Sequence, residues 1–335
     1  MNNTEKQDGI MVTVCCICYN QKNTVGRTLD SILSQKTTFP FEIVVHDDAS
    51  TDGTREIIEK YARENPDKII PVLQTENQYS KGGRPDLYLI PLVNGKYVAF
   101  CEGDDYWCDD EKLQLQVDAL EAYPSCSIAV HNVRKKSAAN GKDLGKFPPV
   151  PVREGYLKAE EYIKQELGNG HWMFQISSLL IRSDVLKQYY KEFDSGYMKK
   201  FMVGDFPMIT YALSKGDAYY IDRDMSVYSV ESGGFMSSIK RNRKMAIRVN
   251  QSYIEGIEGF DRYTHNRFHT YTEKAILRRR FELLILKRDF TTLLSDPDYA
   301  DLLKERGVLK RWKYQLLAII PIIPIIIDRI RERNQ

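Results

Sequence analysis

Two pairs of acidic side chains follow short apolar runs in the N-terminal part of the chain. The first pair is Asp47 and Asp48, and the second is Glu102 and Asp104, which stand on either side of Gly103. The runs before them are short, rich in β-branched or aromatic residues and bounded by turn residues, so each predicts a buried strand. Carboxylates at the carboxyl ends of such strands lie where α/β sheets bind ligands, and they suit a hard divalent cation that carries phosphates. The pattern predicts a nucleotide-diphosphate site.

The spacing of the second pair suits metal chemistry. In an extended segment, Glu102 and Asp104 point the same way, and Gly103 lets a ligand or backbone approach closely. The pair could hold a divalent ion, Mn²⁺ or Mg²⁺, or one ion and a ribose hydroxyl, and the ion would stabilise the diphosphate as a leaving group. Asp104 is the better metal ligand, while the longer Glu102 also fits ribose contact or coordination through water. A solvated acidic turn is the alternative.

The first pair suits a nucleotide base. A carboxylate of Asp47 or Asp48 is a strong acceptor for the N–H of a uracil ring. The alternative is a turn cap in which Ser50 or Asp52 bonds nearby backbone. The second acidic pair favours the nucleotide interpretation.

A further carboxylate, Asp205, precedes the apolar segment Met208–Leu213, which predicts a helix. A carboxylate placed there can take the proton from an attacking hydroxyl as a general base. It can equally cap the helix, because Asp is a favoured N-cap residue. Position alone leaves both roles open.

Several stretches, taken in order, resemble glycosyltransferase family 2 with the GT-A fold. They are Val12-Thr13-Val14 with Tyr19-Asn20, Ser31–Gln35, Asp47–Gly53, Glu102-Gly103-Asp104, Lys112-Leu113-Gln114 and Gly204–Pro207. The amino-acid sequence of Cys101–Trp107 most resembles that of bacterial enzymes of surface-polysaccharide assembly. The chain departs from the family pattern at four positions: Ala49 replaces Gly, Glu102 replaces Asp, Ser229 replaces Arg, and Glu231 stands where many relatives carry His. Glu231 could ligate the metal or be an exposed loop residue.

The resemblance implies an inverting transfer of a sugar from a metal-bound nucleotide-diphosphate sugar, with UDP as the expected nucleotide, to a hydroxyl of a glycan or lipid-linked oligosaccharide. It makes Asp205 the general base, Asp47 the contact to the base ring, and Asp104 and Glu102 the metal ligands. The donor-binding residues carried over from the family are Tyr19, Asn20, Asp47, Asp48, Glu102, Gly103 and Asp104.

The elements that must position these residues alternate between strand-like and helix-like segments up to residue 127. This alternation predicts an α/β fold, Rossmann-like, with a mostly parallel central sheet and helices on both faces. We expect a GT-A domain over 10–238, with a nucleotide-sugar-binding half at 10–127 and an acceptor half at 128–238, and a helical extension over 239–310. Finer expectations are a helix over Asp86–Leu92, a strand over Ile176–Ile181 and a loop over Lys142–Arg153.

The last segment, 311–335, is apolar and basic. Leu316–Ile327 is uninterrupted apolar sequence. It is too short for the ~20 residues of a spanning helix and holds two prolines. Cationic residues and aromatics flank it, which favours docking on an anionic leaflet. Packing on the helical extension or on a second subunit of a homo-oligomer is the alternative.

Composition narrows the class of protein. A net charge of +2 over 335 residues gives no global signal for nucleic-acid binding. Of the six cysteines, three are crowded into the first predicted strand, a spacing that favours buried reduced thiols over a disulfide framework. The polar start, Met1–Gly9, lacks the apolar core of a signal peptide. We therefore expect a cytoplasmic protein, peripheral on the inner face of the cell membrane.

Other functions compete with glycosyl transfer as explanations of the acidic motifs. A non-catalytic scaffold that binds a nucleotide sugar in a polysaccharide assembly complex is the main alternative, although Glu102, Asp104 and Asp205 argue against it. A nucleotidyltransferase should carry a Gly-rich basic loop after the first strand, and Tyr19–Asn23 is not one. The lack of G-x-G-x-x-G after the first strand argues against a dinucleotide-binding dehydrogenase.

Overall fold

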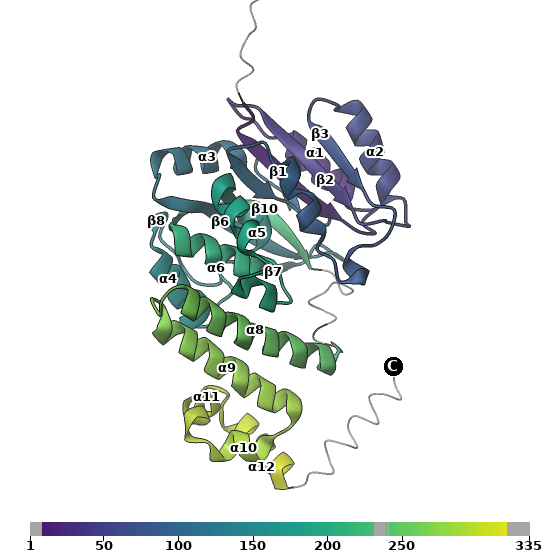
Figure 1. Ribbon diagram of the computed structural model, residues 1–335. Helices are drawn as coiled ribbons and strands as arrows, with labels where there is room; N and C mark the ends of the chain where they lie inside the picture. The colour runs from purple at the N-terminus through teal and green to yellow at the C-terminus, as the bar shows by residue number, and fades with distance from the viewer. Residues whose placement is uncertain (1–8, 231–238, 240, 320–335) are drawn as a thin grey trace, which may run out of the picture. The chain divides into compact units, whose positions relative to one another are not determined.

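The computed structural model describes residues 9–230, 239 and 241–319 (Figure 1). The chain forms two compact units. One comprises residues 1–166, 171–194 and 205–232, and the other residues 167–170, 195–204 and 233–335. The domain boundary expected at residue 238 falls in 231–238, outside the described residues.

The first unit is built on one mixed sheet. Its N-terminal strands are β1 (Val12–Cys18), β2 (Phe41–Asp47), β3 (Ile69–Leu73) and β4 (Tyr97–Phe100), paired in parallel in the order β3-β2-β1-β4. All seven residues of β2 are buried, and its central residues Ile43–Val45 are consecutive apolar residues, as is usual for a strand covered on both faces.

The sheet continues through further strands. These are β5 (Tyr106–Trp107), β6 (Cys126–Ser137), β7 (Asp143–Phe147), β8 (Gly155–Leu157), β9 (Leu180–Arg182) and β10 (Asp217–Val230). Strand β9 runs antiparallel between β4 and β6, and β6 pairs in parallel with β10. The full order is β3-β2-β1-β4-β9-β6-β10-β5, with β7 beside β6 and β8 beside β10.

Helices cover the two faces of the sheet (Figure 1). Helices α1 (Val25–Leu33), α2 (Thr54–Glu64) and α3 (Lys112–Ala122) bury their apolar stripes against alternate residues of β1, β2 and β4 in one core cluster. Helices α5 (Ser183–Glu192) and α6 (Asp205–Lys215) pack against strands β4, β9, β6 and β10, beside the short α4 (Ala159–Ile163). The sheet is therefore held from both sides.

Three finer expectations were wrong. The segment 86–92 is not one helix but two 3₁₀ turns, Pro85–Tyr88 and Ile90–Leu92, because Pro91 removes a backbone donor. The strand expected over 176–181 begins only at Leu180, after the 3₁₀ turn Ile176–Ser178. The expected loop over 142–153 contains β7.

The second unit is helical. It holds α8 (Arg243–Tyr263), α9 (His269–Lys287), α10 (Phe290–Ser295), α11 (Ala300–Glu305) and α12 (Val308–Ile319). Gly256 of α8 lets Phe201 approach, since a Cβ atom there would lie 2.3 Å from the ring of Phe201. A separate core of α9–α12 is formed by Phe281, Phe290, Leu293, Tyr299, Leu303 and Tyr314. Of the helices in the described residues, none has the length and apolarity to cross a membrane.

Candidate active site

The carboxyl ends of β1, β2 and β4 meet at one edge of the sheet. Cys18 is in register with Asp47, and its carbonyl oxygen accepts the N–H of Asp48 at 3.0 Å. On the other side of β1, the N–H of Gly103 donates to the carbonyl of Ile17 at 3.0 Å. The parallel pairing therefore brings the two acidic loops together, as the sequence predicts.

Asp47 ends β2 fully buried, with its two carboxylate oxygens in different situations. Oδ2 accepts the backbone N–H of Ser50 at 3.1 Å, which closes a turn. Oδ1 is buried without a hydrogen-bond partner among the described residues. The turn needs a left-handed residue at Ala49, whose φ is 60°. This explains why the resembling family carries glycine there. The buried, unused oxygen is suited to an N–H donor from a ligand.

Asp48 has a different task. Its Oδ1 accepts the N–H of Gln78 at 2.8 Å and its Oδ2 accepts the N–H of Tyr79 at 3.1 Å. The side chain of Asn77 in turn donates to the carbonyl of Asp48 at 3.0 Å. Both carboxylate oxygens are used to hold the segment after β3, so the geometry favours a positioning role for Asp48 rather than the direct donor contact expected from the sequence.

The loop after β1 is fastened to the first acidic loop. Asn20, with a φ of 53°, accepts the N–H of Thr51 on its side-chain oxygen at 2.9 Å, and its own N–H donates to the hydroxyl of Ser50 at 2.8 Å. Asn20 is thus part of the scaffold. Its neighbour Tyr19 is 49% exposed, which leaves an aromatic face at the same edge of the sheet.

Gly103 is required by close packing. A Cβ atom there would lie 2.3 Å from Oε1 of Gln21 and 2.6 Å from Sγ of Cys18. The carbonyl of Gly103 also accepts the hydroxyl of Thr28 at 3.1 Å. The glycine therefore lets the second acidic loop lie directly on the end of β1.

Glu102 and Asp104 flank that glycine with their charges close together. The pKa of the Glu102 carboxyl is raised to about 8. Loss of hydration is the largest cause, and the negative charges of Asp104 and Asp205 add to it. Glu102 nevertheless keeps exposed surface and Asp104 is half-buried, so both can meet a ligand. A set of carboxylates that destabilise one another's charge is the environment that a divalent cation neutralises.

The residues present fit such a cation only in part. Oxygen ligands from Glu102 and Asp104 match the preference of Mn²⁺ or Mg²⁺. Within the described residues, no group of three or more His, Cys, Asp or Glu side chains is arranged to hold a metal ion. Glu231 lies outside the described residues. The described residues therefore supply two oxygen ligands, and phosphate oxygens of a bound nucleotide would add others.

Asp105, the next residue, is buried and locked in place. Its Oδ1 accepts the N–H of Ser229 and its Oδ2 accepts the side-chain amide of Gln175, both at 2.9 Å. Burial, with the charges of Asp104 and Glu102, raises the pKa of Asp105 well above its usual value, and the two hydrogen bonds oppose that rise. Asp105 ties β10 to the acidic loop.

Asp205 opens α6, half-buried, and its Oδ1 accepts the N–H of Phe206 at 2.8 Å. Burial raises the pKa of this carboxyl, against the effect of backbone hydrogen bonds. Its charge also contributes to the raised pKa of Glu102, so the two carboxylates interact. A carboxylate with a raised pKa is a stronger base than an ordinary aspartate, which suits proton removal at neutral pH.

Arg27 was not expected from the sequence. Its Nη2 atom donates to the carbonyl of Asp104 at 3.3 Å, and the guanidinium lies 4.1 Å from the ring centre of Tyr106. The side chain is exposed. Nothing in the sequence around α1 signals this cation, because the contact joins residues 77 positions apart. The arrangement places a positive group beside the second acidic loop.

An aromatic group lies near the same carboxylates. Trp172 packs on Phe147 with ring centres 4.9 Å apart, and on Tyr228 at 6.5 Å. Trp172 and Tyr228 are half-buried, and the Trp172 indole N–H donates to the carbonyl of Phe174 at 2.9 Å. The charges of Glu102 and Asp205 contribute to a raised pKa of Tyr228, after burial. These contacts fix the half-buried ring of Trp172 against Phe147 and Tyr228.

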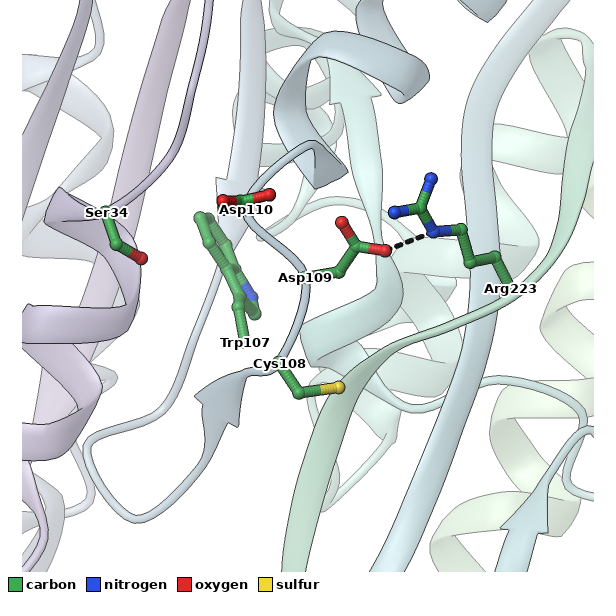
Figure 2. Close-up of a pocket in the computed structure, with 6 residues that line it drawn as sticks. All are labelled: Ser34, Trp107, Cys108, Asp109, Asp110 and Arg223. Carbon is green, nitrogen blue, oxygen red and sulfur yellow. Dashed lines mark ion pairs between the residues drawn. The ribbon is translucent and has the colours of Figure 1, made fainter.

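A separate polar pocket of about 430 Å³ lies beyond β5. Figure 2 shows its lining residues, with the Asp109 carboxylate turned toward the guanidinium of Arg223; the lining is Ser34, Trp107, Cys108, Asp109, Asp110 and Arg223. None of the predicted site residues lines it. Its carboxylates are already paired, Asp109 with Arg223 and Asp110 with Lys36, so this pocket adds nothing to the acidic site.

Comparison with known proteins identifies the family. Residues 13–190 match the family model described as glycosyl transferase family 2. The UDP-Glc:alpha-D-GlcNAc-diphosphoundecaprenol beta-1,3-glucosyltransferase WfaP of Escherichia coli is 35% identical over 113 residues, 33% of this chain and 41% of WfaP. The putative teichuronic acid biosynthesis glycosyltransferase TuaG of Bacillus subtilis is 31% identical over 141 residues, 42% of this chain and 53% of TuaG. The chain thus aligns with about half or less of these relatives.

Solved structures show the same fold. Staphylococcus aureus TarS 1–349, in complex with UDP-GlcNAc, matches with a TM-score of 0.54 at 18% identity, covering 86% of this chain and 83% of TarS. The mannosyltransferase PcManGT of Pyrobaculum calidifontis, in complex with GDP-Man and Mn²⁺, matches with a TM-score of 0.53 at 18% identity. The match covers 92% of this chain and 83% of PcManGT. The fold is GT-A with additional C-terminal helices. The family model spans more than half of the sequence, and the chain belongs to glycosyl transferase family 2.

Proposed function

We propose that the protein is an inverting glycosyltransferase that moves a sugar from a UDP-linked donor to a hydroxyl of a glycan or lipid-linked oligosaccharide in bacterial surface-polysaccharide synthesis. The observation that carries the proposal is that Gly103 bonds the end of β1 and so holds Glu102 and Asp104 at the carboxyl edge of the sheet, close enough to Asp205 for their charges to interact. The names of WfaP and TuaG, which describe enzymes of lipid-linked glycan and teichuronic acid synthesis, support the acceptor class.

Donor binding is assigned to the first acidic loop. The buried Oδ1 of Asp47, without a partner among the described residues, would accept the N–H of a uracil ring. Satisfying that oxygen would recover much of the cost of its burial. Tyr19, exposed at the same edge, would lie against the nucleotide.

The diphosphate is assigned to the second acidic loop. Glu102 and Asp104 would hold Mn²⁺ or Mg²⁺, which supplies charge neutralisation of the departing diphosphate. Arg27, beside the Asp104 carbonyl, would add hydrogen-bond donors to the same phosphates.

Asp205 is assigned the role of general base. Its carboxylate would take the proton of the acceptor hydroxyl as that oxygen attacks the anomeric carbon on the face opposite the diphosphate, in a single displacement with an oxocarbenium-like transition state. Its raised pKa strengthens it for this role. We place the enzyme in the cytoplasm, peripheral on the inner face of the cell membrane, where a lipid-linked acceptor would be reached.

Calorimetric titration tests the donor site. UDP, GDP and dTDP are titrated with and without Mn²⁺ into the parent protein, Asp104→Asn and Asp205→Asn, with the exposed Asp67→Asn as a matched control. We expect Mn²⁺-dependent binding of UDP that is lost in Asp104→Asn and kept in the other two.

Turnover separates the enzyme from the scaffold. With the donor sugar found by screening UDP-sugars for hydrolysis or transfer, Asp205→Asn should lose turnover by about 10²–10⁴-fold while it binds UDP normally. A variant with unchanged turnover would remove Asp205 from the mechanism. Nucleotide binding without turnover by the parent on any acceptor would favour the scaffold.

A further inference from the structure

Helix α12 exposes apolar side chains on a scale that the rest of the described chain does not match. Its five outward residues are Val308 (71% exposed), Leu309 (89%), Trp312 (65%), Leu316 (55%) and Ile319 (76%). Single exposed apolar residues are ordinary on a protein surface, whereas a contiguous group marks an interaction site.

The group is contiguous because of helical geometry. Successive residues turn by about 100°, so the five side chains fall within an arc of about 100° on one side of the helix. The opposite side is already used: Tyr314 is buried and stacks on Phe290 with ring centres 5.5 Å apart, and Leu317 and Ala318 pack on the same core. Helix α12 therefore has one apolar face that the fold buries and a second that it leaves outside.

The charges around the outer face have one sign. Lys313 borders it on one edge and Arg311 on the other, with Lys310 exposed further round, and α12 contains no acidic residue. An aromatic and aliphatic face bordered by cations is the pattern of a helix that lies in a membrane interface. The sequence that follows, outside the described residues, continues with Ile320–Ile327 and then alternates Arg329, Arg331 and Arg333 with other residues.

We propose that the outer face of α12 docks on an anionic lipid surface, with the helix lying in the plane of the headgroups. Trp312, Leu309 and Leu316 enter the headgroup–acyl boundary, and Arg311 and Lys313 contact lipid phosphates. The inference concerns the second unit and stands whether or not the proposed glycosyl transfer is correct.

Charge decides against a second copy of the chain as the occupant. In a two-fold contact of this face with itself, Arg311 and Lys313 of both copies would meet like charges at the rim, with no acidic residue on α12 to pair them. An anionic leaflet would bury the apolar face in its acyl boundary and pair the flanking cations with lipid phosphates.

Vesicle sedimentation with the purified full-length protein tests the proposal. The probes are vesicles of phosphatidylcholine alone and of phosphatidylcholine mixed equally with phosphatidylglycerol. We expect binding to the anionic vesicles that weakens with salt, with a blue shift of Trp312 emission. Leu309→Gln with Trp312→Gln should lower partitioning by about tenfold or more.

Matched variants make the result specific. Leu144→Gln, a leucine 43% exposed on β7, should bind as the parent does. Replacing Arg311 and Lys313 by Gln should remove the preference for anionic lipid, whereas replacing the exposed Lys60 and Arg63 of α2 by Gln should not. Trp312→Leu should keep binding but lose the emission shift.

Two results would overturn the proposal. One is a folded Leu309→Gln, Trp312→Gln protein that sediments with vesicles as the parent does, since another part of the chain would then carry any binding. The other is a parent protein that binds neither kind of vesicle and is a dimer by light scattering, while the same double variant is a monomer.

Discussion

Nη2 of Arg27 lies 3.4 Å from the hydroxyl oxygen of Ser229. Ser229 occupies the position where the resembling family carries an arginine, and the guanidinium of Arg27 on α1 lies within hydrogen-bond distance of the Ser229 hydroxyl. Nη2 also donates to the carbonyl of Asp104 at 3.3 Å. A cation is therefore present beside the second acidic loop although residue 229 is not one.

We predict from this relationship that Arg27→Gln weakens UDP binding about tenfold and lowers kcat/KM about 10²-fold, because a charged donor to the leaving diphosphate is lost. Arg27→Lys should recover part of the loss, since it keeps the charge but not the planar fork. Calorimetry and initial rates measure both, with the exposed Arg63→Gln as control. Unchanged UDP affinity in a folded Arg27→Gln protein would remove the guanidinium from the donor site.

The adjacent carboxylates Asp47 and Asp48 should respond differently to the same change. Asp47→Asn should weaken UDP binding by about 1–3 kcal/mol with little change in stability, because the acceptor meant for the base becomes an amide. Asp48→Asn should instead destabilise the protein by about 1–3 kcal/mol, since only one oxygen remains to accept the N–H groups of Gln78 and Tyr79. Thermal melts and UDP titrations on both variants decide between these roles, and identical behaviour of the two would contradict the assignment.

Ala49 offers a stabilising change. Its φ of 60° costs a residue with a Cβ atom about 1–2 kcal/mol, which glycine does not incur. Because glycine loses more entropy on folding, we expect Ala49→Gly to stabilise the protein by roughly 0.5–1 kcal/mol. Denaturant titration measures it, and Ala122→Gly in the last turn of α3 should destabilise instead.

The sequence predicts the first half of the fold well because its strands and helices are local patterns. The buried run of β2 and the helical spacing of α1 each specify an element without distant partners. Parallel pairing of neighbours then places both acidic loops at one edge. The site residues found by pattern are therefore those that follow strands.

What the sequence does not predict depends on distant contacts. The 3₁₀ turn Ile176–Ser178 takes the place of the first half of the expected strand, and Gln175 just before it caps the turn and donates its amide to Asp105, 70 residues away. Strand β7 forms where Gly and Pro suggest a loop, because it pairs with β6. Arg27 reaches Ser229 across 202 residues, and no local pattern encodes such a contact.

Lys112 of α3 provides a pH-dependent prediction. It is fully buried, its ammonium donates to Oε1 of Gln116 at 2.7 Å, and Nζ lies 4.1 Å from the ring centre of Trp107. Burial lowers the pKa of Lys112 from 10.5 to about 7. The family-like Lys-Leu motif thus holds a lysine whose charge the fold disfavours.

The sign of the effect on stability follows from proton binding. Between pH 7 and 10.5 the unfolded chain binds the proton of Lys112 and the folded protein does not, so this residue's contribution to stability rises with pH, by at most about 1.4 kcal/mol per unit. Lys112→Met removes that contribution. The free energy of unfolding of the variant minus that of the parent should be largest near pH 7 and should fall as the pH approaches 10. Denaturant titrations at several pH values measure the difference, with the exposed Lys60→Met as control. A stability difference between Lys112→Met and the parent that stays constant from pH 7 to 10 would mean that Lys112 remains charged in its buried place, held by Gln116 and the face of Trp107.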